Sequence, residues 1–318
     1  MKGPKNRPSG AGLRRFLLAP PLCRDLDRLR ASVGGKTVLI TGASYGVGEA
    51  TALLLGRAGA EVILLARSQD RLEEVARTLI REGHDASAYA LDLYRPADVA
   101  PLMAFIESQH PRIDVIVSNA GKSVRRSVLH ASEKRDLERS LAVNFSGPAA
   151  LILALLPRMV AQGGGQIVNV SSVSAKPPGA PRWAAYQGSK AGFDLWLGSV
   201  AAELGPHGVT ASSVYLPLVR TRMSAATRLY DHLPALTPLE AAQALAQTLV
   251  RPTTRAAPWW LFWMEVVALL WPGTLRRALG WIDARLPPDK AAPEKTAPGR
   301  RSDRLSLREE PFGETDGP

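Results

Sequence analysis

The chain has 318 residues, 46% of them hydrophobic and 22% charged, so it is able to bury one large core. Its single cysteine, Cys23, excludes an intramolecular disulfide and a metal cluster built on cysteines, and it fits a reducing compartment. We therefore expect one large domain in the cytoplasm, without a bound metal.

The excess of positive charge is concentrated at the N-terminus. More than half of the formal net charge of +11 lies in the first 30 residues, where two aspartates accompany eight basic residues: Lys2, Lys5, Arg7, Arg14, Arg15, Arg24, Arg28 and Arg30. We interpret residues 1–34 as a basic arm, suited to an anionic membrane surface or equally to a disordered, solubilising segment. No nucleic-acid motif accompanies the arm, so no nucleic-acid partner is expected. The apolar run before Pro20 is too short for an export signal.

Short apolar runs alternate with helix-length segments between residues 35 and 252. The predicted strands cover residues 38–41, 61–66, 87–91, 114–118, 166–171 and 210–215. The predicted helices cover residues 46–58, 70–82, 96–110, 132–162 and 185–205. This alternation predicts parallel β-α-β units with right-handed crossovers. The expected fold class is α/β, a Rossmann-type doubly wound parallel sheet with helices on both faces and ligands at the carboxyl ends of its strands.

The turn after the first predicted strand contains three glycines. Glycine permits a tight turn and lets the backbone approach a pyrophosphate, which then binds amide groups at the start of the following helix. The spacing G-x-x-x-G-x-G differs from the commoner G-x-G-x-x-G fingerprint. We predict a dinucleotide site at Thr41, Gly42, Ser44, Tyr45, Gly46, Val47 and Gly48.

A second group of residues combines Ser172 with Tyr186, which lies 14 positions later, and with Lys190, one helical turn beyond. Residues at i and i+4 share a helix face. The ordinary pKa of tyrosine is ~10, and an adjacent lysine cation lowers the pKa by stabilising the phenolate. Tyr186 is therefore a candidate proton donor, and we expect Lys190 to depress its pKa.

Taken in order, these motifs resemble the short-chain dehydrogenase/reductase family from about residue 35 to residue 252. The shared marks are the glycine turn, Asp92 with Leu93, Asn119-Ala120-Gly121, Asn144, Ser172, Tyr186 and Lys190. The resemblance implies a catalytic tetrad in which Tyr186 transfers a proton, Ser172 binds the substrate oxygen, Lys190 binds the nicotinamide ribose and Asn144 holds a relay water. It also implies that the coenzyme contacts Asp92, Leu93, Asn119, Ala120, Gly121, Tyr186, Lys190, Val219 and Thr221.

The end of the second predicted strand bears on the choice of coenzyme. An acidic residue there would bind the ribose diol of NAD, whereas Arg67 offers a 2′-phosphate a planar, charged fork. We therefore predict NADP(H), bound with the help of Arg67 and Ser68. Many NADP-using members of the family place a second basic residue before the middle glycine, but this chain has Tyr45 there.

Two departures from the family pattern concern the substrate side. The spacing from Ser172 to Tyr186 is one residue longer than usual, which implies an insertion within 176–181 at the rim of the pocket. Pro217 stands where the family usually has glycine. Residues 220–233 are predicted to form a substrate lid, and the sequence around them resembles a bacterial branch of the family that handles long-chain lipids, including fatty acyl-CoA reductases.

The C-terminal part adds elements that a compact reductase does not require. Residues 253–286 form an apolar, tryptophan-rich extension, predicted to be helical and too short to cross a bilayer. Two interpretations stay open: an interfacial element peripheral to the inner face of the membrane, or a helix that covers the core, a dimer mate or the substrate pocket. Residues 287–318 are predicted to be disordered.

The predicted function is an NADP(H)-dependent oxidoreductase that transfers a hydride to or from a hydrophobic carbonyl or alcohol. A fatty acyl-CoA or fatty aldehyde is the narrower hypothesis. A ketone or hydroxysteroid-like dehydrogenase is the alternative enzyme, and a non-catalytic NADPH-binding scaffold is the alternative of another class. The family resemblance also implies a homodimer or homotetramer through the helices of Asn144 and Tyr186, unless the C-terminal extension blocks one interface.

Overall fold

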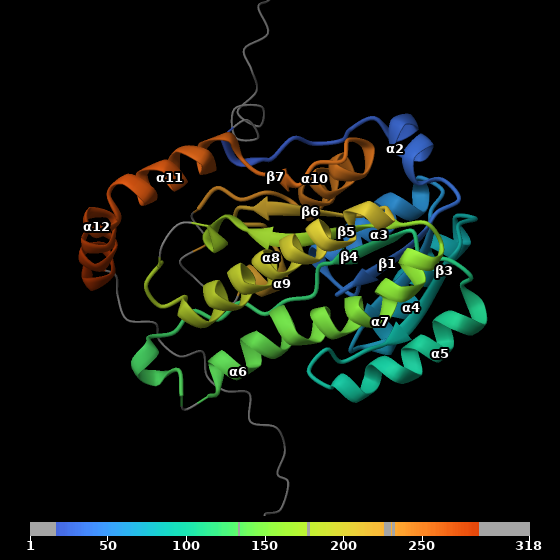
Figure 1. Ribbon diagram of the computed structural model, residues 1–318, viewed down its shortest axis with the longest axis horizontal. Helices are drawn as coiled ribbons and strands as arrows, with labels where there is room; N and C mark the ends of the chain where they lie inside the picture. The colour runs from blue at the N-terminus through green and yellow to red at the C-terminus, as the bar shows by residue number, and fades with distance from the viewer. Residues whose placement is uncertain (1–16, 133, 177–178, 226–229, 231–232, 286–318) are drawn as a thin grey trace, which may run out of the picture. The chain divides into compact units, whose positions relative to one another are not determined.

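A computed structural model describes residues 17–132, 134–176, 179–225, 230 and 233–285 (Figure 1). Within these residues, seven strands form one sheet in the order β3-β2-β1-β4-β5-β6-β7, with every neighbouring pair parallel. The strands are β1 (Thr37–Thr41), β2 (Glu61–Ala66), β3 (Ala86–Ala90), β4 (Val115–Ser118), β5 (Gly165–Ser172), β6 (Val209–Leu216) and β7 (Arg255–Ala256). The longer helices are α2 (Leu26–Val33), α3 (Gly46–Arg57), α4 (Gln69–Arg81), α5 (Val99–Gln109), α6 (Asp136–Leu141), α7 (Gly147–Ala161), α8 (Ala184–Leu204), α10 (Pro238–Val250), α11 (Trp259–Leu270) and α12 (Pro272–Arg285).

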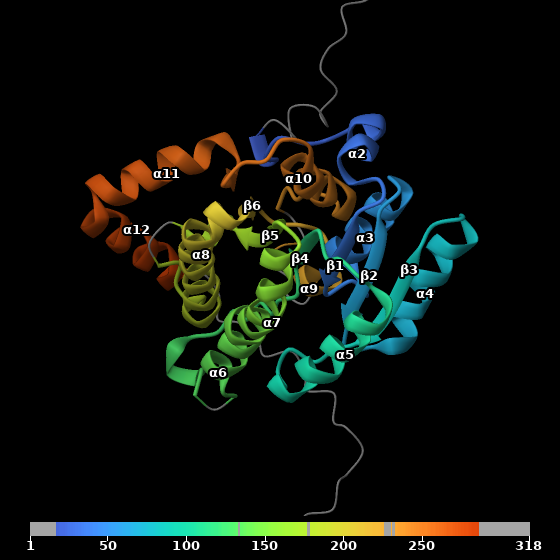
Figure 2. The same ribbon diagram turned by 45° about the vertical axis from the view of Figure 1, so that its right-hand side comes forward.

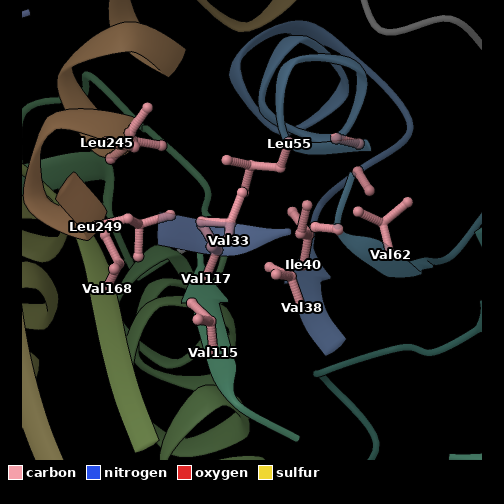
Figure 3. Packing of buried hydrophobic residues seen from close by; sticks show 14 of the residues in the cluster. Val33, Val38, Ile40, Leu55, Val62, Val115, Val117, Val168, Leu245 and Leu249 are labelled. Carbon is pink, nitrogen blue, oxygen red and sulfur yellow. The ribbon is translucent and has the colours of Figure 1, made fainter. Parts of the chain in front are cut away.

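Helices cover both faces of the sheet, because its central strands are apolar on both sides. In β1, Val38 and Ile40 pack with α2, α3, α4 and α10, whereas Leu39 packs with α5, α7 and α8 on the opposite face. Figure 3 shows the first cluster, in which side chains of α3 and α10 meet β1 and β4. The two layers are visible on either side of the sheet in Figure 2. The predicted doubly wound α/β class is therefore confirmed.

The strand order places the predicted site at a reversal of the sheet. β1 pairs with β2 on one side and with β4 on the other. The strands that follow β1 therefore extend the sheet in one direction, and the strands that follow β4 extend it in the opposite direction. At such a point the connections leave the carboxyl ends of the two strands on opposite faces, and a ligand fits between them. The glycine turn after β1 and the Asn119 loop after β4 lie at this point.

The predicted helix over residues 132–162 is interrupted. It begins at Asp136 as α6, widens into a π-helical turn (η3, Ala142–Ser146), and continues as α7 to Ala161. Hydrophobic periodicity does not reveal a single extra residue per turn, so the sequence could not predict the π turn. Such turns frequently occur at functional sites, and this one carries Asn144.

The predicted N-terminal arm is wrong in its second half. Residues 26–33 form α2, whose Leu29 and Val33 are buried against the core. The Asp25 side chain accepts a hydrogen bond from the Arg28 amide and caps the helix. The exposed arginines of α2 give it a basic composition although its inner face is apolar, which is why counting charge alone misplaced the boundary at residue 34.

The C-terminal boundary of the Rossmann domain also moves. α10 begins with a capping box, in which Thr237 and Glu240 exchange hydrogen bonds, and the short β7 then pairs with β6 beyond residue 252. The extension that follows consists of α11 and α12. The predicted disordered tail, residues 287–318, lies outside the described residues.

Within the described part of the chain, one helix is long and apolar enough to cross a membrane by length and composition, the continuous rod of residues 136–161. Half of its most apolar stretch is buried in the protein. Leu151, Ile152 and Leu155 belong to the core cluster against the sheet, so the rod has the composition of an interior helix for a reason visible in the fold.

Candidate active site

The turn between β1 and α3 accepts glycine alone at two of its positions. Gly42 and Gly46 have φ angles of +69° and +63°, in the left-handed region. A Cβ on Gly48 would lie 2.2 Å from the Gly42 carbonyl oxygen. The residue before α3, Tyr45, provides no side-chain cap, so the first amides of the helix keep their donors for another acceptor. The turn fits the pyrophosphate of a dinucleotide.

The loop after β4 holds the glycine turn in place. The Asn119 side-chain amide donates to the carbonyl oxygens of Thr41 (2.9 Å) and Gly42 (3.2 Å). In return, the Thr41 hydroxyl accepts from the backbone amides of Asn119 and Ala120, both at 3.0 Å. Of the predicted coenzyme residues, Thr41 and Asn119 therefore have a visible structural task, which is to fix the shape of the cradle.

The other residues predicted at the turn lie around the same edge. Ser44 is half-buried in the turn, and Val47 packs on the core cluster. Asp92 follows β3 and accepts a hydrogen bond from the Tyr94 amide (3.1 Å), while Leu93 is buried. The ends of β1, β3 and β4 thus lie along the same edge of the sheet, with β2 between β1 and β3, and the coenzyme contacts of Asp92 and Leu93 stay a prediction.

Two arginines that were not predicted to bind the coenzyme contact the aromatic ring of Tyr45. The Arg71 guanidinium on α4 lies 4.7 Å from the ring centroid, and that of Arg222 lies 4.5 Å from it. Arg222 begins the short helix α9 (Arg222–Ala225) in the predicted lid. Arg67 and Ser68 are exposed at the end of β2. Cations from a helix and from the lid therefore lie next to the position where many relatives carry a basic residue.

The lid segment starts directly over the glycine turn. The Thr221 methyl carbon would be 3.0 Å from a Cβ on Gly46, and Val219 forms an isolated bridge with Leu236. A cavity of about 70 Å³ opens between the two ends of the lid, lined by Leu218, Arg220, Thr221, Ser224, Ala225, Tyr230 and Ala235. The predicted contact of Val219 and Thr221 with the coenzyme side of the cleft is compatible with these positions.

The four tetrad residues converge at the carboxyl end of β5. Ser172 is the last residue of that strand, and Tyr186 and Lys190 lie on successive turns of α8. Ser172 is placed to hydrogen-bond to the Tyr186 hydroxyl, and its Oγ also hydrogen-bonds to Ser174 Oγ at 2.8 Å. The buried Lys190 Nζ donates to the Val170 carbonyl oxygen at 2.9 Å.

Asn144 is tied into this group by three hydrogen bonds. Its Oδ1 accepts from the Lys122 amide (2.7 Å), and its Nδ2 donates to the Lys122 carbonyl oxygen and to the Ser189 hydroxyl, both at 2.9 Å. The Ser189 hydroxyl donates in turn to the Tyr186 carbonyl oxygen at 2.8 Å. A Cβ on Gly121 would lie 3.2 Å from Asn144 Oδ1 and 3.4 Å from Lys190 Nζ. The π turn thus joins the β4 loop to α8.

The expected depression of the Tyr186 pKa is wrong for the protein without coenzyme. Burial raises the pKa of Tyr186, and the hydrogen bond from Ser172 offsets only part of that rise. Burial also lowers the pKa of Lys190 to about 8, against a smaller opposite effect of Asp194. The reason is positional, because Lys190 donates to a backbone carbonyl rather than to the phenol.

A buried polar network between α8 and β6 was not predicted from the sequence. Asp194 Oδ2 accepts from the Tyr215 hydroxyl (2.5 Å) and pairs with Lys176 Nζ (2.8 Å). Burial opposes the charge on Asp194, but hydrogen bonds from Lys176, Ser213 and Tyr215 outweigh it and hold the pKa of Asp194 below its usual value. The spacing could have indicated this role of Asp194, because Asp194 lies one turn beyond Lys190 on the helix face of Tyr186 and Lys190.

Aromatic side chains line the approach to Tyr186. The Trp183 ring meets that of Tyr186 edge to face, with centroids 5.8 Å apart, and stacks on Tyr230 of the lid at 6.1 Å. Gln187 fixes the preceding loop by donating to the Ser174 carbonyl oxygen (2.7 Å) and accepting from the Ala180 amide (2.9 Å). Trp183 and Tyr230 therefore form an aromatic wall beside the reaction centre.

Known proteins agree with this architecture. A family model described as short chain dehydrogenase matches residues 36–231. A fatty acyl-CoA reductase of Acinetobacter baylyi is 38% identical over 229 residues, covering 72% of this chain and 77% of that protein. A fatty acyl-CoA reductase of Mycobacterium tuberculosis is 35% identical over 225 residues, covering 70% and 76%.

Solved structures are similar as well. A metagenomic short-chain oxidoreductase in complex with NADP is 32% identical, with a TM-score of 0.60, covering 69% of this chain and 92% of that one. A gluconate 5-dehydrogenase from Burkholderia cenocepacia, in complex with NADP and tartrate, is 25% identical with a TM-score of 0.63, covering 72% and 94%. The fold and the ordered motifs define a dinucleotide-dependent oxidoreductase. The chain belongs to the short-chain dehydrogenase family.

Proposed function

We propose that the protein is an NADP(H)-dependent reductase of a long-chain lipid carbonyl, with a fatty acyl-CoA or fatty aldehyde as substrate. The convergence of Ser172, Tyr186, Lys190 and Asn144 beside the glycine cradle carries this proposal. When bound, the coenzyme supplies the hydride that reduces the substrate carbon. The two fatty acyl-CoA reductases among the relatives support the substrate class.

The side chains of the site provide the proton chemistry. The raised pKa of Tyr186 keeps its phenol protonated at neutral pH, so it is ready to donate to the oxygen of a carbonyl being reduced. Ser172, already hydrogen-bonded to that phenol, orients the same oxygen. Lys190 is mostly cationic below its pKa of about 8, and it would hold the nicotinamide ribose, as the family resemblance implies. Asn144 positions α8 through Ser189.

Coenzyme choice follows from the cations near the end of β2. Arg67 and Ser68 would bind the 2′-phosphate of NADP(H), as the sequence predicts. Arg71 and Arg222, both in contact with the Tyr45 ring, extend this positive surface from α4 to the predicted lid. The planar guanidinium groups suit phosphate oxygens, and the NADP complexes among the structural neighbours support this assignment.

A phosphorylated substrate is favoured by the surroundings of Lys122. This residue follows Gly121 and is held next to Asn144. Burial lowers the pKa of Lys122, and repulsion from Arg139, Arg67 and Arg126 lowers it further, although Asp136 opposes them. Lys122, half-buried beside Asn144, is the cation that would meet a phosphate of coenzyme A. Reduction of the thioester would take up the hydride at carbon and break the C–S bond, with a proton required by the leaving thiolate.

Turnover of NADPH with long-chain acyl-CoAs, aldehydes and ketones tests the function. Tyr186→Phe is expected to lower the reduction rate by about 10²–10⁴-fold, while NADPH binding, measured by coenzyme fluorescence, remains. A non-catalytic scaffold would bind NADPH without consuming it with any of these compounds. Retention of full activity in Tyr186→Phe would refute the proton transfer, and preference for a steroid ketone would support the alternative dehydrogenase.

We propose that the protein assembles as a homo-oligomer through the helices that carry the tetrad. Leu153 on α7 and Leu195 on α8 are exposed, at 54% and 73%. Their helices belong to the same core cluster on one face of the sheet, and an isologous contact would cover both leucines. Sedimentation of the full chain tests this, with Leu195→Asp expected to shift the distribution toward monomer.

A further inference from the structure

Helices α11 and α12 present an apolar surface that the described part of the chain leaves uncovered. Within α11, Leu261 is the buried residue, although the helix is almost entirely apolar. Ten large apolar side chains of this segment are exposed: Trp259, Phe262, Trp263, Met264, Val267, Leu269, Leu270, Trp271, Trp281 and Ile282. The solvent exposure reaches 60% for Trp263 and 78% for Leu269. Contiguous apolar surfaces of this kind mark interaction sites.

The acidic side chains of the two helices are neutralised from the core side. Glu265 of α11 pairs with Arg255 of β7 at 2.5 Å, and Asp283 of α12 pairs with Arg182 at 2.8 Å. These two ion pairs attach the helices to the sheet edge and to the loop before α8. They also remove negative charge from the exposed face.

The arginines of α12 are not neutralised by ion pairs within the described residues. Arg276 and Arg277 are exposed and donate to carbonyl oxygens of their own helix, and Arg285 lies over the Trp281 ring at 3.4 Å. Among the described residues, no acidic group pairs with any of these three arginines. The exposed surface therefore combines a wide apolar face with a positive border.

The described chain begins beside the same surface, and the sequence that precedes it is basic. Trp260 Nε1 of α11 donates to the Leu17 carbonyl oxygen at 2.6 Å, so the described chain begins in contact with this helix. The 16 residues that precede Leu17 contain five basic residues and no acidic one. An anionic partner at α11 would therefore attract both the arginines of α12 and the N-terminal sequence.

We propose that α11 and α12 dock the protein on an anionic lipid surface. With 12 residues, α11 is too short to span a bilayer, which takes about 20 residues. It would lie in the interface with Trp263 and Leu269 toward the acyl chains, where tryptophan is favoured. The arginines of α12 would contact the lipid headgroups. A second copy of the chain is a poorer occupant, because a symmetric contact would bring two sets of unpaired arginines together.

The docking surface adjoins the entrance to the reaction centre. Asp283 of α12 holds Arg182, and the next residue, Trp183, meets the Tyr186 ring. A long apolar substrate that leaves the lipid phase at α12 would thus reach the aromatic wall of the cleft without crossing bulk water. The lipid surface is proposed from α11, α12 and their charges, so it does not depend on the assigned substrate.

Vesicle co-sedimentation of the full chain, without coenzyme or substrate, tests the docking. We expect binding to vesicles of mixed phosphatidylcholine and phosphatidylglycerol, and much weaker binding to phosphatidylcholine alone. Leu269→Asp should reduce binding at least tenfold. The matched control is Leu129→Asp, which alters a leucine of similar exposure, 81%, on a 3₁₀ turn outside α11 and α12 and should leave binding unchanged. Replacing Arg276 and Arg277 by glutamine should weaken binding to the anionic vesicles about fivefold for each arginine.

Circular dichroism and NADPH binding show that each variant is folded. Wild-type protein that stays in solution with anionic vesicles overturns the proposal. Equal losses of binding in Leu269→Asp and Leu129→Asp overturn it as well. If Leu269→Asp changes the sedimentation coefficient of the free protein and the wild-type protein does not bind vesicles, the surface is an interface between copies. Because these measurements omit turnover, their failure leaves the proposed reductase activity standing.

Discussion

Replacing Lys190 by methionine is expected to change how the stability of the coenzyme-free protein depends on pH. Lys190 is buried, and burial lowers its pKa to about 8 from the ordinary value of 10.5. Between these two pH values the unfolded chain binds more protons than the folded one, so stability rises with pH. Below pH 8 both states are protonated, and the full cost of the buried charge is present.

The size of this contribution follows from the two pKa values. Their difference corresponds to about 3 kcal/mol of lost stability at neutral pH, relative to strongly alkaline solution. Between pH 7 and 9.5 the folded protein should recover about 2 kcal/mol of it. The methionine variant lacks this recovery, and it also loses the hydrogen bond from Nζ to Val170, worth about 1–3 kcal/mol. At pH 7 the variant should therefore be as stable as wild type or somewhat more stable.

Urea unfolding of the apoprotein, followed by tryptophan fluorescence at several pH values, measures the difference. Wild type should gain about 2 kcal/mol over Lys190→Met as the pH rises from 7 to 9.5. Lys36→Met, at an exposed lysine, is the control and should follow the wild-type curve. The range stops below pH 10 because the raised pKa of Tyr186 acts with the opposite sign at higher pH. Parallel curves for wild type and Lys190→Met would refute the assignment of Lys190 as a buried, destabilising cation.

Three further outcomes are expected. Gly48→Ala places a Cβ 2.2 Å from the Gly42 carbonyl oxygen, so NADPH binding measured by fluorescence titration should be lost; Gly198→Ala on α8, with open space around it, should bind normally. Lys122→Gln should raise KM about fivefold for an acyl-CoA and leave that of the matching fatty aldehyde unchanged; equal effects on both would contradict a role toward phosphate. Arg222→Gln should weaken NADPH binding about tenfold without affecting NADH, and unchanged selectivity would show that its contact with the turn is only structural.

The sheet, and the place of Tyr186 and Lys190 on one helix, were predictable because their signals are local or periodic. Apolar strands buried on both faces, such as β1 and β4, stand out from the helices between them, and this alternation predicts parallel pairing. Tyr186 and Lys190 share a helix face by spacing alone. The glycines that require a left-handed φ or leave no space for a Cβ leave a mark in the sequence, since other residue types cannot replace them.

The properties that depend on packing were not predictable in the same way. The sign of the Tyr186 pKa change depends on how far burial outweighs neighbouring charges, and spacing does not measure burial. The contact of Arg222 with Tyr45 joins residues far apart in the chain, so no local pattern reveals it. The π turn at Asn144 depends on one added residue in a helical turn. The packing of α2 depends on one apolar face of a helix that is basic overall. Composition reveals neither feature.

The extra residue between Ser172 and Tyr186 changes the entrance to the site rather than its chemistry. Tyr186, Lys190 and Asp194 are spaced by single turns of α8, so their relative positions depend on the helix and not on the loop before it. Asp194 accepts from Tyr215 of β6 and thereby fixes this helix against the sheet. Lys176, at the start of the longer loop, pairs with the same carboxylate, so the loop is held at the base of the site. The added length therefore falls on the side of Arg182 and Trp183, where α12 and the lid meet the cleft, and it is there that differences in substrate between this protein and its relatives are expected to arise.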